Sequence, residues 1–467
     1  MIITANARID GRQELIAKLS GKLTLKSSPS DAELILYAYE AWGEDCVKHL
    51  IGDFAFAIWD NRLQRFFCAR DHFGVKPFFY THIEDSFKFS STLNELRLDP
   101  RVSNALNEVA LGDYLLFGLN RDLSTTTFKD IQRLPPGHSL TVTKESIKLR
   151  RYWSPAVSGE VRFQDRYSYV ERFSELLSRA VEDRLRTDRV SVSMSGGLDS
   201  TSIAALACNH ANLQACAVVY DHLIPDQERY YSTAAAQHLG IPITYVVADR
   251  YSLFDEQVPG DMDQPEPFLI SPLTGQFNDL LRLCAAFGQV ALTGYDGDAF
   301  MNEPQPSRFN IRSRLRRLLG KHAPEPVLPE WIDESFARRT NLHERLKQSS
   351  VQPSSPANPI WTALFEGYDP GATKLDLEVR HPFIDVRLVE YLLSIPVAPW
   401  RVNKHILRVA MKDRLPAAVV NRPKTPLAGD PALQLARHAS VRWLDSFEVS
   451  PQLSNFVNLN LRRPLAN

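Results

Sequence analysis

The hydrophobic positions in the first third of the chain change their spacing more than once. Residues 32–42 place apolar side chains at helical spacing, which predicts a helix. Residues 54–60 (FAFAIWD) and 65–71 (RFFCARD) are short, aromatic-rich runs of the kind found in buried strands. The turn-rich segment LPPGHSL at 134–140 then interrupts the pattern. We therefore expect residues 1–155 to form an α+β domain with a covered sheet.

From Tyr169 onward the pattern alternates between helices and strands. After a first amphipathic helix, the strands that we expect are residues 189–194, 215–220, 243–248 and 289–294, with helices between them at 199–210, 229–239 and 272–287. Such alternation favours a parallel, doubly wound sheet, whose ligands bind beyond the carboxyl ends of the strands. We therefore predict an α/β domain over residues 156–467, with a largely helical C-terminal part.

Composition and charge narrow the class of protein. The 467 residues are 44% hydrophobic and 23% charged, which is typical of a globular protein. The net charge of −1 gives no overall field that would recruit nucleic acid or an acidic membrane. The chain has no apolar run long enough for a signal peptide or a membrane span, and its five scattered cysteines lack metal-binding spacing. We expect a cytoplasmic protein that binds neither nucleic acid nor membrane.

The segment Ser195-Gly-Gly-Leu-Asp-Ser200 lies where a strand is expected to end and a helix to begin. Its glycines let the backbone approach a ligand, and the first amides of a helix form an anion site. Asp199 makes sense in a phosphate site chiefly as a magnesium ligand. A glycine pair by itself more often marks only a tight turn, and the P-loop pattern GxxxxGK[ST] is absent. The whole motif in this context predicts a loop that binds the pyrophosphate of ATP.

A second acidic motif, TGYDGD at 293–298, follows another expected strand of the same sheet. It places Asp296 and Asp298 at a strand carboxyl end, where a carboxylate can share a magnesium ion with Asp199. Taken alone, such a turn is more often merely a solvated acidic loop. Together with the first motif it makes Asp298 the second metal ligand that we predict.

Two later segments carry candidate chemistry. RPKTP at 422–426 holds Lys424 between two prolines, where a fixed ammonium can stabilise charge that develops on a phosphate or a tetrahedral centre. The ordinary alternative is a surface lysine. EVRHPFID at 378–385 fits a structural ion pair and an active-site wall equally well.

Together these segments resemble the asparagine synthetase family. The resemblance covers nearly the whole chain, including DAELILYAYEAWG, LIGDFAFAIWD, ARDHFGVKPFFY, SGGLDS, TGYDGD, EVRHPFID, KHILRVAMKDRLP and RPKTP. It implies a glutaminase-like sandwich of the N-terminal-nucleophile type over residues 1–155, in truncated or degenerate form. It further implies an ATP-pyrophosphatase domain over residues 156–467 that releases AMP and pyrophosphate. The chain looks most similar to the lasso peptide cyclase-like members.

The resemblance also implies a set of site residues. Those that would bind ATP are Met194, Ser195, Gly196, Gly197, Asp199, Ser200, Val219, Thr293, Gly294 and Lys404. Within that set, Met194, Val219, Thr293 and Gly294 match an adenine pocket, and Lys404 matches a phosphate contact. The remaining implied roles are magnesium binding by Asp199 and Asp298 and stabilisation of the activated intermediate by Lys424.

The chain departs from the family in its first domain. The family's glutaminase uses a cysteine directly after the initiator methionine, whereas this sequence begins Met1-Ile2. The glutamine-binding segment NGEIYN reads NARIDG here, so Arg8 replaces the glutamate that holds the substrate's amine. Asp31 is the one candidate retained from the glutamine site. We therefore expect an inactive glutaminase.

A second departure lies in the synthetase motif. Tyr295 stands in place of the glutamate that helps ammonia to attack, and Ala299 in place of a second acid. Tyr295 fits proton transfer if its pKa is lowered, and fits a wall residue equally well. Related β-lactam synthetases and lasso peptide cyclases lack a working glutaminase and use an amine within the substrate.

Three functions follow as hypotheses. In the first, ATP adenylates an Asp or Glu side chain of a precursor peptide and the peptide's own amine closes a macrolactam, with a peptide-recognition protein and a cysteine protease as partners. The second is asparagine synthesis from aspartate, either with ammonia as the amine or, if the sequence is N-terminally truncated and an upstream Met-Cys precedes it, with glutamine as the source. The third is a non-catalytic scaffold. A basic cluster fits either a peptide-binding rim or a solvated face; it comprises Arg308, Arg312, Arg314, Arg316, Arg317 and Lys321.

Overall fold

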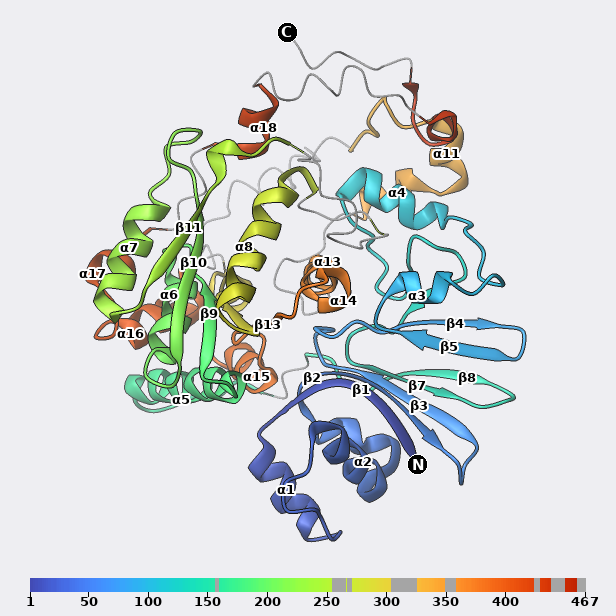
Figure 1. The fold of residues 1–467 in the computed structure, drawn as a ribbon, viewed down its shortest axis with the longest axis horizontal. Helices are drawn as coiled ribbons and strands as arrows, with labels where there is room; N and C mark the ends of the chain where they lie inside the picture. Colours follow the sequence, from blue (N-terminus) through green and yellow to red (C-terminus); the bar gives the residue numbers. More distant parts are fainter. Residues whose placement is uncertain are drawn as a thin grey trace, which may run out of the picture.

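The computed structural model describes residues 1–155, 159–253, 266, 271–303, 326–348, 358–423, 429–437 and 450–459. Two sheet-containing parts lie side by side, with helix α13 (Pro359–Tyr368) between them (Figure 1). The basic cluster and Lys424 lie outside the described residues. Within the described part of the chain, no helix is both long and apolar enough to cross a bilayer.

The N-terminal part is built on antiparallel strands. Its larger sheet has the order β1-β2-β3-β7-β8 and consists of β1 (Ile2–Asp10), β2 (Ile51–Asp60), β3 (Arg65–Arg70), β7 (His138–Val142) and β8 (Ile147–Arg151). A smaller sheet has the order β5-β4-β6 and consists of β4 (Phe79–Ile83), β5 (Ser86–Ser90) and β6 (Gln132–Arg133). Helices α1 (Arg12–Ser20) and α2 (Asp31–Trp42) cover the larger sheet on one face (Figure 1).

Strand β2 shows why this sheet is covered on both faces. Phe54, Phe56 and Ile58 pack with the apolar side of α2, whereas Ala55 and Ala57 face the core shared with the smaller sheet. Successive side chains of a strand point to opposite faces, so large residues alternate with small ones. The expectation of a covered α+β sheet is confirmed.

The second part contains a parallel five-stranded sheet in the order β11-β10-β9-β12-β13. Its strands are β9 (Arg189–Ser193), β10 (Asn212–Val219), β11 (Ile243–Val247), β12 (Val290–Thr293) and β13 (Glu378–Arg380). The connecting helices are α6 (Leu198–Ala207), α7 (Glu228–Leu239) and α8 (Thr274–Phe287), with α6 and α7 on one face and α8 on the other (Figure 1). The predicted doubly wound sheet is therefore confirmed.

The remaining helices surround these two sheets. They are α3 (Leu93–Arg97), α4 (Glu108–Phe117), α5 (Arg166–Leu185), α9 (Gly297–Met301), α11 (Glu334–Arg339), α12 (Leu342–Lys347), α14 (Pro370–Thr373), α15 (Val386–Ser394), α16 (His405–Met411), α17 (Ala417–Val420) and α18 (Pro431–Ala436). In its described residues the C-terminal part is largely helical, as the sequence predicts.

Within the parallel sheet, one strand escapes prediction from the sequence. Strand β13 has only three residues, and Val379 is its single apolar side chain between Glu378 and Arg380. A segment this short shows no period of two, so its partner β12 is what makes it a strand.

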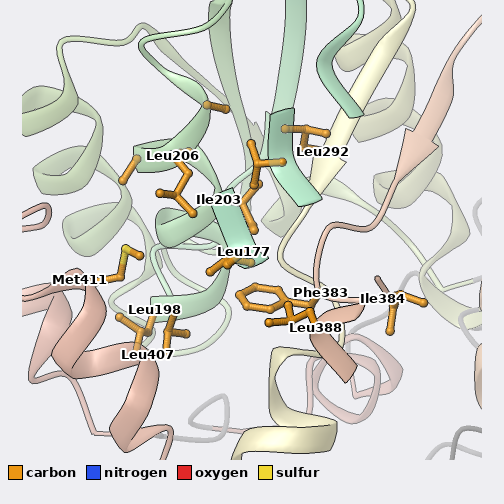
Figure 2. Packing of buried hydrophobic residues seen from close by; sticks show 14 of the residues in the cluster. Leu177, Leu198, Ile203, Leu206, Leu292, Phe383, Ile384, Leu388, Leu407 and Met411 are labelled. Carbon is orange, nitrogen blue, oxygen red and sulfur yellow. The ribbon is translucent and has the colours of Figure 1, made fainter. Parts of the chain in front are cut away.

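The largest apolar cluster fixes the ends of the central strands. Leu177 of α5, Ile203 of α6 and Leu292 of β12 pack together with Phe383 and Leu407, which come from distant parts of the sequence (Figure 2). Each fully buried side chain of this size contributes roughly 1.5–3 kcal/mol relative to exposure. The loops that follow β9 and β12 are therefore carried on rigid elements.

Candidate active site

The two acidic motifs meet where the strand order of the parallel sheet reverses. The chain runs from β9 outward to β11 on one side, and β12 and β13 lie on the other. Loop 195–200 follows β9 and loop 293–298 follows β12, so both leave the sheet at the same edge. In open α/β sheets this switch point is where ligands bind.

Glycines allow the two loops to approach closely. Gly196 has φ +71°, and a Cβ there would lie 2.6 Å from the backbone nitrogen of Ser232 in α7. A Cβ on Gly294 would collide with the backbone of Ser200. Both positions therefore require glycine for steric reasons.

Loop 195–200 presents donors to an anion. Helix α6 begins at Leu198 with Gly197 as its N-cap, so no side chain of that cap occupies the first amides of the helix. The hydroxyl groups of Ser195 and Ser200 lie 3.4 Å apart beside them. This arrangement suits a phosphate or pyrophosphate group.

Asp199 and Asp298 share one cation, although they are a hundred residues apart in the sequence. The Nζ atom of Lys404 lies 2.5 Å from Oδ2 of Asp199 and 2.8 Å from Oδ1 of Asp298. Lys404 is the N-cap of α16, and its backbone N–H donates to the carbonyl of Met301 at the end of α9. The structure thus brings together three residues that the sequence assigns to ATP and magnesium.

A pocket of about 780 Å³ opens over these groups. The predicted site residues that line it are Ser195, Gly197, Asp199, Ser200, Thr293, Gly294, Tyr295, Asp298 and Lys404. The volume lies in the range typical of small-molecule sites. Met194 and Val219 are fully buried at the ends of β9 and β10, so their assignment to an adenine pocket stays a prediction.

Behind the pocket, His381 supports the wall made by the second motif. Its Nδ1 atom lies 2.7 Å from Oγ1 of Thr293, which also accepts the backbone N–H of Tyr295. Burial lowers the pKa of His381 to about 3, so the ring is neutral. In the same segment Glu378 and Arg380 form an ion pair at 2.5 Å. Segment 378–385 therefore contains an ion pair and a histidine that contacts Thr293 from behind, whereas no residue of the segment is among those that line the pocket.

Burial also changes the acid–base properties of the second motif. It raises the pKa of Tyr295, and the neighbouring Asp296 adds to this shift. Burial, with the charges of Asp298 and Asp199, raises the pKa of Asp296 to about 8. Proton transfer by Tyr295 needs a lowered pKa, which is the opposite direction.

The far end of the pocket contains residues to which the sequence motifs assign no role, although one of them, Arg422, begins the RPKTP segment. Arg422 pairs with Glu228 at 2.8 Å, and Arg408 donates to the carbonyl of Arg422. Both arginines and Glu228 line the pocket. Arg422 lies only two residues before Lys424, so these contacts hold the start of the RPKTP segment at the pocket rim. The proximity of Arg422 and Glu228 depends on packing between α7 and α17, and it leaves no local signal in the sequence.

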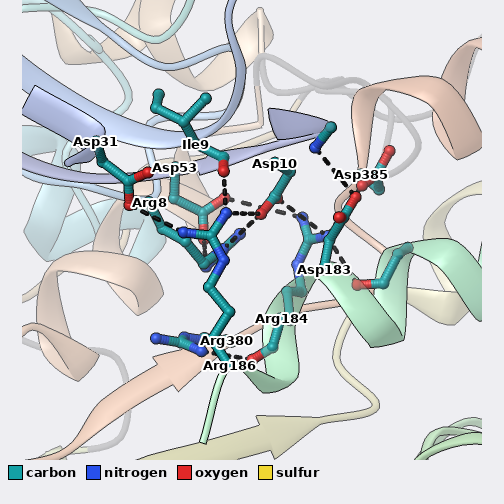
Figure 3. A network of polar contacts seen from close by, with 12 residues as sticks. Arg8, Ile9, Asp10, Asp31, Asp53, Asp183, Arg184, Arg186, Arg380 and Asp385 are labelled. Carbon is teal, nitrogen blue, oxygen red and sulfur yellow. Dashed lines mark hydrogen bonds and ion pairs between the residues drawn. The ribbon is translucent and has the colours of Figure 1, made fainter. Parts of the chain in front are cut away.

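In the first domain, Arg8 lies inside a buried network of charges (Figure 3). Its guanidinium donates to Asp10 at 2.9 Å and to Asp53 at 2.6 Å, and the residue is 2% exposed. Arg184 of α5 extends the network to Asp385 at 2.9 Å, and it lies 3.4 Å from Asp10. The network therefore crosses the interface between the two parts.

Asp31, the candidate retained from the glutamine site, is also paired. Arg186 contacts its carboxylate at 2.9 Å, and Arg12 contacts the other oxygen. The carboxylate thus joins the N-terminal part to the loop after α5.

Gly297, the first residue of α9, packs directly against the carboxylate of Asp199, and this contact gives a testable prediction. A Cβ added at Gly297 would lie 2.5 Å from Cγ of Asp199, so Gly297→Ala should push this carboxylate aside. We expect affinity for magnesium-ATP, measured by titration calorimetry, to fall at least about tenfold, the loss that follows when a ligand's supporting contact is disturbed. The control is Gly21→Ala, where the added Cβ meets only Lys18 O at 3.8 Å. Unchanged binding in Gly297→Ala would contradict the role in magnesium-ATP binding that the sequence predicts for Asp199.

Comparison with known proteins gives the class of the two parts. Residues 1–153 match the family model described as a glutamine amidotransferase domain, and residues 172–446 match the model described as asparagine synthase. An amidotransferase-type domain is thus followed by a synthetase-type α/β domain. Because the second match spans more than half of the chain, the protein belongs to the asparagine synthase family. The general class is that of ATP-dependent carbon–nitrogen ligases.

Curated relatives agree with this assignment. The chain is 29% identical over 470 residues to asparagine synthetase [glutamine-hydrolyzing] 3 of Bacillus subtilis (strain 168), covering 91% of this chain and 75% of the relative. It is 27% identical over 486 residues to asparagine synthetase [glutamine-hydrolyzing] 2 of the same organism, covering 91% of this chain and 62% of the relative. The solved glutamine phosphoribosylpyrophosphate amidotransferase from B. subtilis superposes with a TM-score of only 0.24 at 14% identity, over 56% of this chain and 48% of that chain.

Proposed function

We propose that the protein uses ATP to adenylate a carboxylate, releases pyrophosphate, and joins the activated carboxylate to an amine with release of AMP. The observation that carries this proposal is the meeting of loop 195–200, Asp298 and Lys404 in one pocket at the switch point of the sheet. A phosphate-binding helix terminus beside an acid pair is an arrangement suited to a metal-bound polyphosphate.

The donor set fits magnesium. Within the described residues no group of three or more His, Cys, Asp or Glu side chains is arranged to hold a metal by itself. Mg²⁺ commonly takes one or two carboxylates and completes its shell with substrate phosphates and water. Asp199 and Asp298 would supply the two carboxylates, and the ion would neutralise charge on the phosphates.

The remaining residues have distinct proposed tasks. The amides at the start of α6 and the hydroxyl groups of Ser195 and Ser200 bind the β- and γ-phosphates of ATP, and they bind the pyrophosphate that these phosphates form when the bond to AMP breaks. Thr293, fixed by His381, positions the wall of the pocket. Lys424, which follows the segment tied to the rim by Arg422, stabilises the negative charge of the activated intermediate.

Tyr295 is proposed as a wall residue rather than as a base. Since burial raises its pKa, the phenol stays protonated at neutral pH and cannot accept a proton from the amine. We expect Tyr295→Phe, which keeps the ring, to lower the turnover rate less than about tenfold, whereas loss of a general base typically costs 10²–10⁴-fold. Steady-state rates from pH 6 to 9 distinguish the two roles. A large loss of turnover rate in Tyr295→Phe, together with a pH profile of the natural protein that follows a single ionisation, would instead support proton transfer by Tyr295.

The attacking amine can come from more than one source. Arg8 places a paired guanidinium where the family has the glutamate that holds glutamine, which supports an amine that does not come from glutamine hydrolysis. Two reactions then remain, which differ in the amine that attacks the activated carboxylate. Asparagine formation from aspartate and ammonia is favoured by the names of the relatives. Macrolactam formation in a precursor peptide, with a recognition protein and a cysteine protease as partners, is favoured by Tyr295 and Ala299 in the acidic motif.

Hydroxylamine trapping tests the proposal whatever the natural amine is, because hydroxylamine itself attacks an activated carboxylate. The protein is incubated with ATP, magnesium, hydroxylamine and one carboxylate at a time: aspartate, glutamate, or peptides that carry either side chain. We expect a hydroxamate only where the carboxylate is the substrate, so aspartate alone identifies the synthetase and peptides alone identify the cyclase. No hydroxamate and no nucleotide consumption with any of them would favour a non-catalytic scaffold.

A further inference from the structure

Lys404 occupies the place between two carboxylates that a divalent cation would take. Its side chain is 11% exposed and that of Asp199 is 15% exposed, whereas Asp298 is 42% exposed. Nζ contacts one oxygen of each carboxylate, at 2.5 Å and 2.8 Å. An ammonium and a metal ion cannot both lie at the midpoint of this pair, because they repel each other and need the same oxygens.

The backbone holds Lys404 in this place. Lys404 and the preceding Asn403 both have positive φ, at +56° and +49°, which non-glycine residues rarely adopt. The N–H of Lys404 donates to the carbonyl of Met301 at 2.7 Å, and Arg401 donates to the carbonyl of Phe300 at 3.0 Å. These contacts tie the start of α16 to α9, which carries Asp298. The four-carbon stem of a lysine has several rotatable bonds, so Nζ can change partner without a movement of the backbone.

Charge balance gives this arrangement a consequence. The ammonium of Lys404 offsets part of the negative charge of the two carboxylates, so they attract a free divalent cation more weakly than they would without Lys404. A polyphosphate at the start of α6 changes the balance, since it supplies further oxygen ligands for the metal and a new anionic partner for the ammonium.

We propose that Lys404 is a placeholder cation: it holds Asp199 and Asp298 together before substrate binds and yields their oxygens to the metal only when a polyphosphate arrives. This inference rests on the proposed magnesium site. It makes the metal and the nucleotide bind together, because each improves the site for the other. It also assigns Lys404 a positioning role before catalysis, in addition to the phosphate contact predicted from the sequence.

Manganese binding tests this proposal without any turnover. Binding of Mn²⁺ to the full-length protein is followed by electron paramagnetic resonance, with and without inorganic pyrophosphate. We expect the natural protein to bind Mn²⁺ tightly only with pyrophosphate, and Lys404→Met to bind Mn²⁺ without it at least about tenfold more tightly than the natural protein does, as expected for removal of a competing charge. Lys404→Arg should behave like the natural protein.

Controls separate the possible outcomes. Lys412→Met, which removes an exposed lysine just after α16, should leave the affinity unchanged. Circular dichroism checks folding, and Lys404→Gln repeats the test if the methionine variant unfolds. Equal Mn²⁺ affinity in the natural protein and both neutral variants without pyrophosphate would overturn the placeholder role. If no form binds Mn²⁺ even with pyrophosphate or ATP, the proposed metal site itself is wrong and the inference falls with it.

Discussion

Asp199→Ala is expected to lower ATP-dependent activation of a carboxylate by at least about 100-fold, the typical cost of removing one charge-stabilising group from an active site. The change removes one of the two proposed metal ligands and one of the two carboxylates that Lys404 contacts in the described part of the chain. The measurement is the initial rate of hydroxamate formation with the carboxylate that serves as substrate, together with calorimetric affinity for magnesium-ATP.

The matched control is Asp188→Ala. Asp188 is an exposed residue directly before β9, at the opposite end of that strand from loop 195–200. We expect this variant to keep the natural rate. A full rate in Asp199→Ala would show that the loop does not bind a metal-bound nucleotide. It would then favour the hypothesis that the protein is a non-catalytic scaffold.

Arg184→Met is expected to lower the free energy of unfolding by about 3 kcal/mol, the low end of the cost of breaking a buried ion pair. Arg184 is 1% exposed and lies between Asp10 of the first part and Asp385 of the second. Burial alone would raise the pKa of Asp385, but Arg387 and Arg184 together hold it well below its ordinary value. Methionine keeps much of the apolar stem but leaves these carboxylates with less compensating charge.

Urea denaturation monitored by circular dichroism and by tryptophan fluorescence measures this loss. The control is Arg172→Met on the same helix, because Arg172 forms only an exposed pair with Glu175, and such pairs contribute at most about 1 kcal/mol. Equal stability of the two variants would mean that the network in Figure 3 does not stabilise the contact between the two parts.

The sequence predicts those elements whose pattern is local. Strand β2 alternates aromatic residues with alanine, and helix α5 carries a long apolar stripe, so both can be expected within a few residues of their observed ends. Loop 195–200 is predictable because its glycines and acid lie within six residues. Strand β13 is not, because it has one apolar side chain and depends on β12 for its pairing.

Properties that arise from packing are beyond such prediction. The salt bridge between Arg422 and Glu228 joins residues nearly two hundred positions apart, and the sequence shows no sign of it. The raised pKa of Tyr295 depends on burial, which a motif does not reveal. The contact of Lys404 with both acids likewise depends on how α16 meets α9. Residue type and spacing can name the participants of the site but not their mutual contacts.

The identity of the nucleotide product tests the central claim most directly. Once a carboxylate supports hydroxamate formation, the nucleotide products of the same reaction are separated by chromatography and counted against the hydroxamate. Adenylation predicts one AMP and one pyrophosphate for each hydroxamate formed, and neither in the Asp199→Ala variant. ADP and inorganic phosphate in equal amounts would show that the carboxylate is phosphorylated instead and would contradict the account.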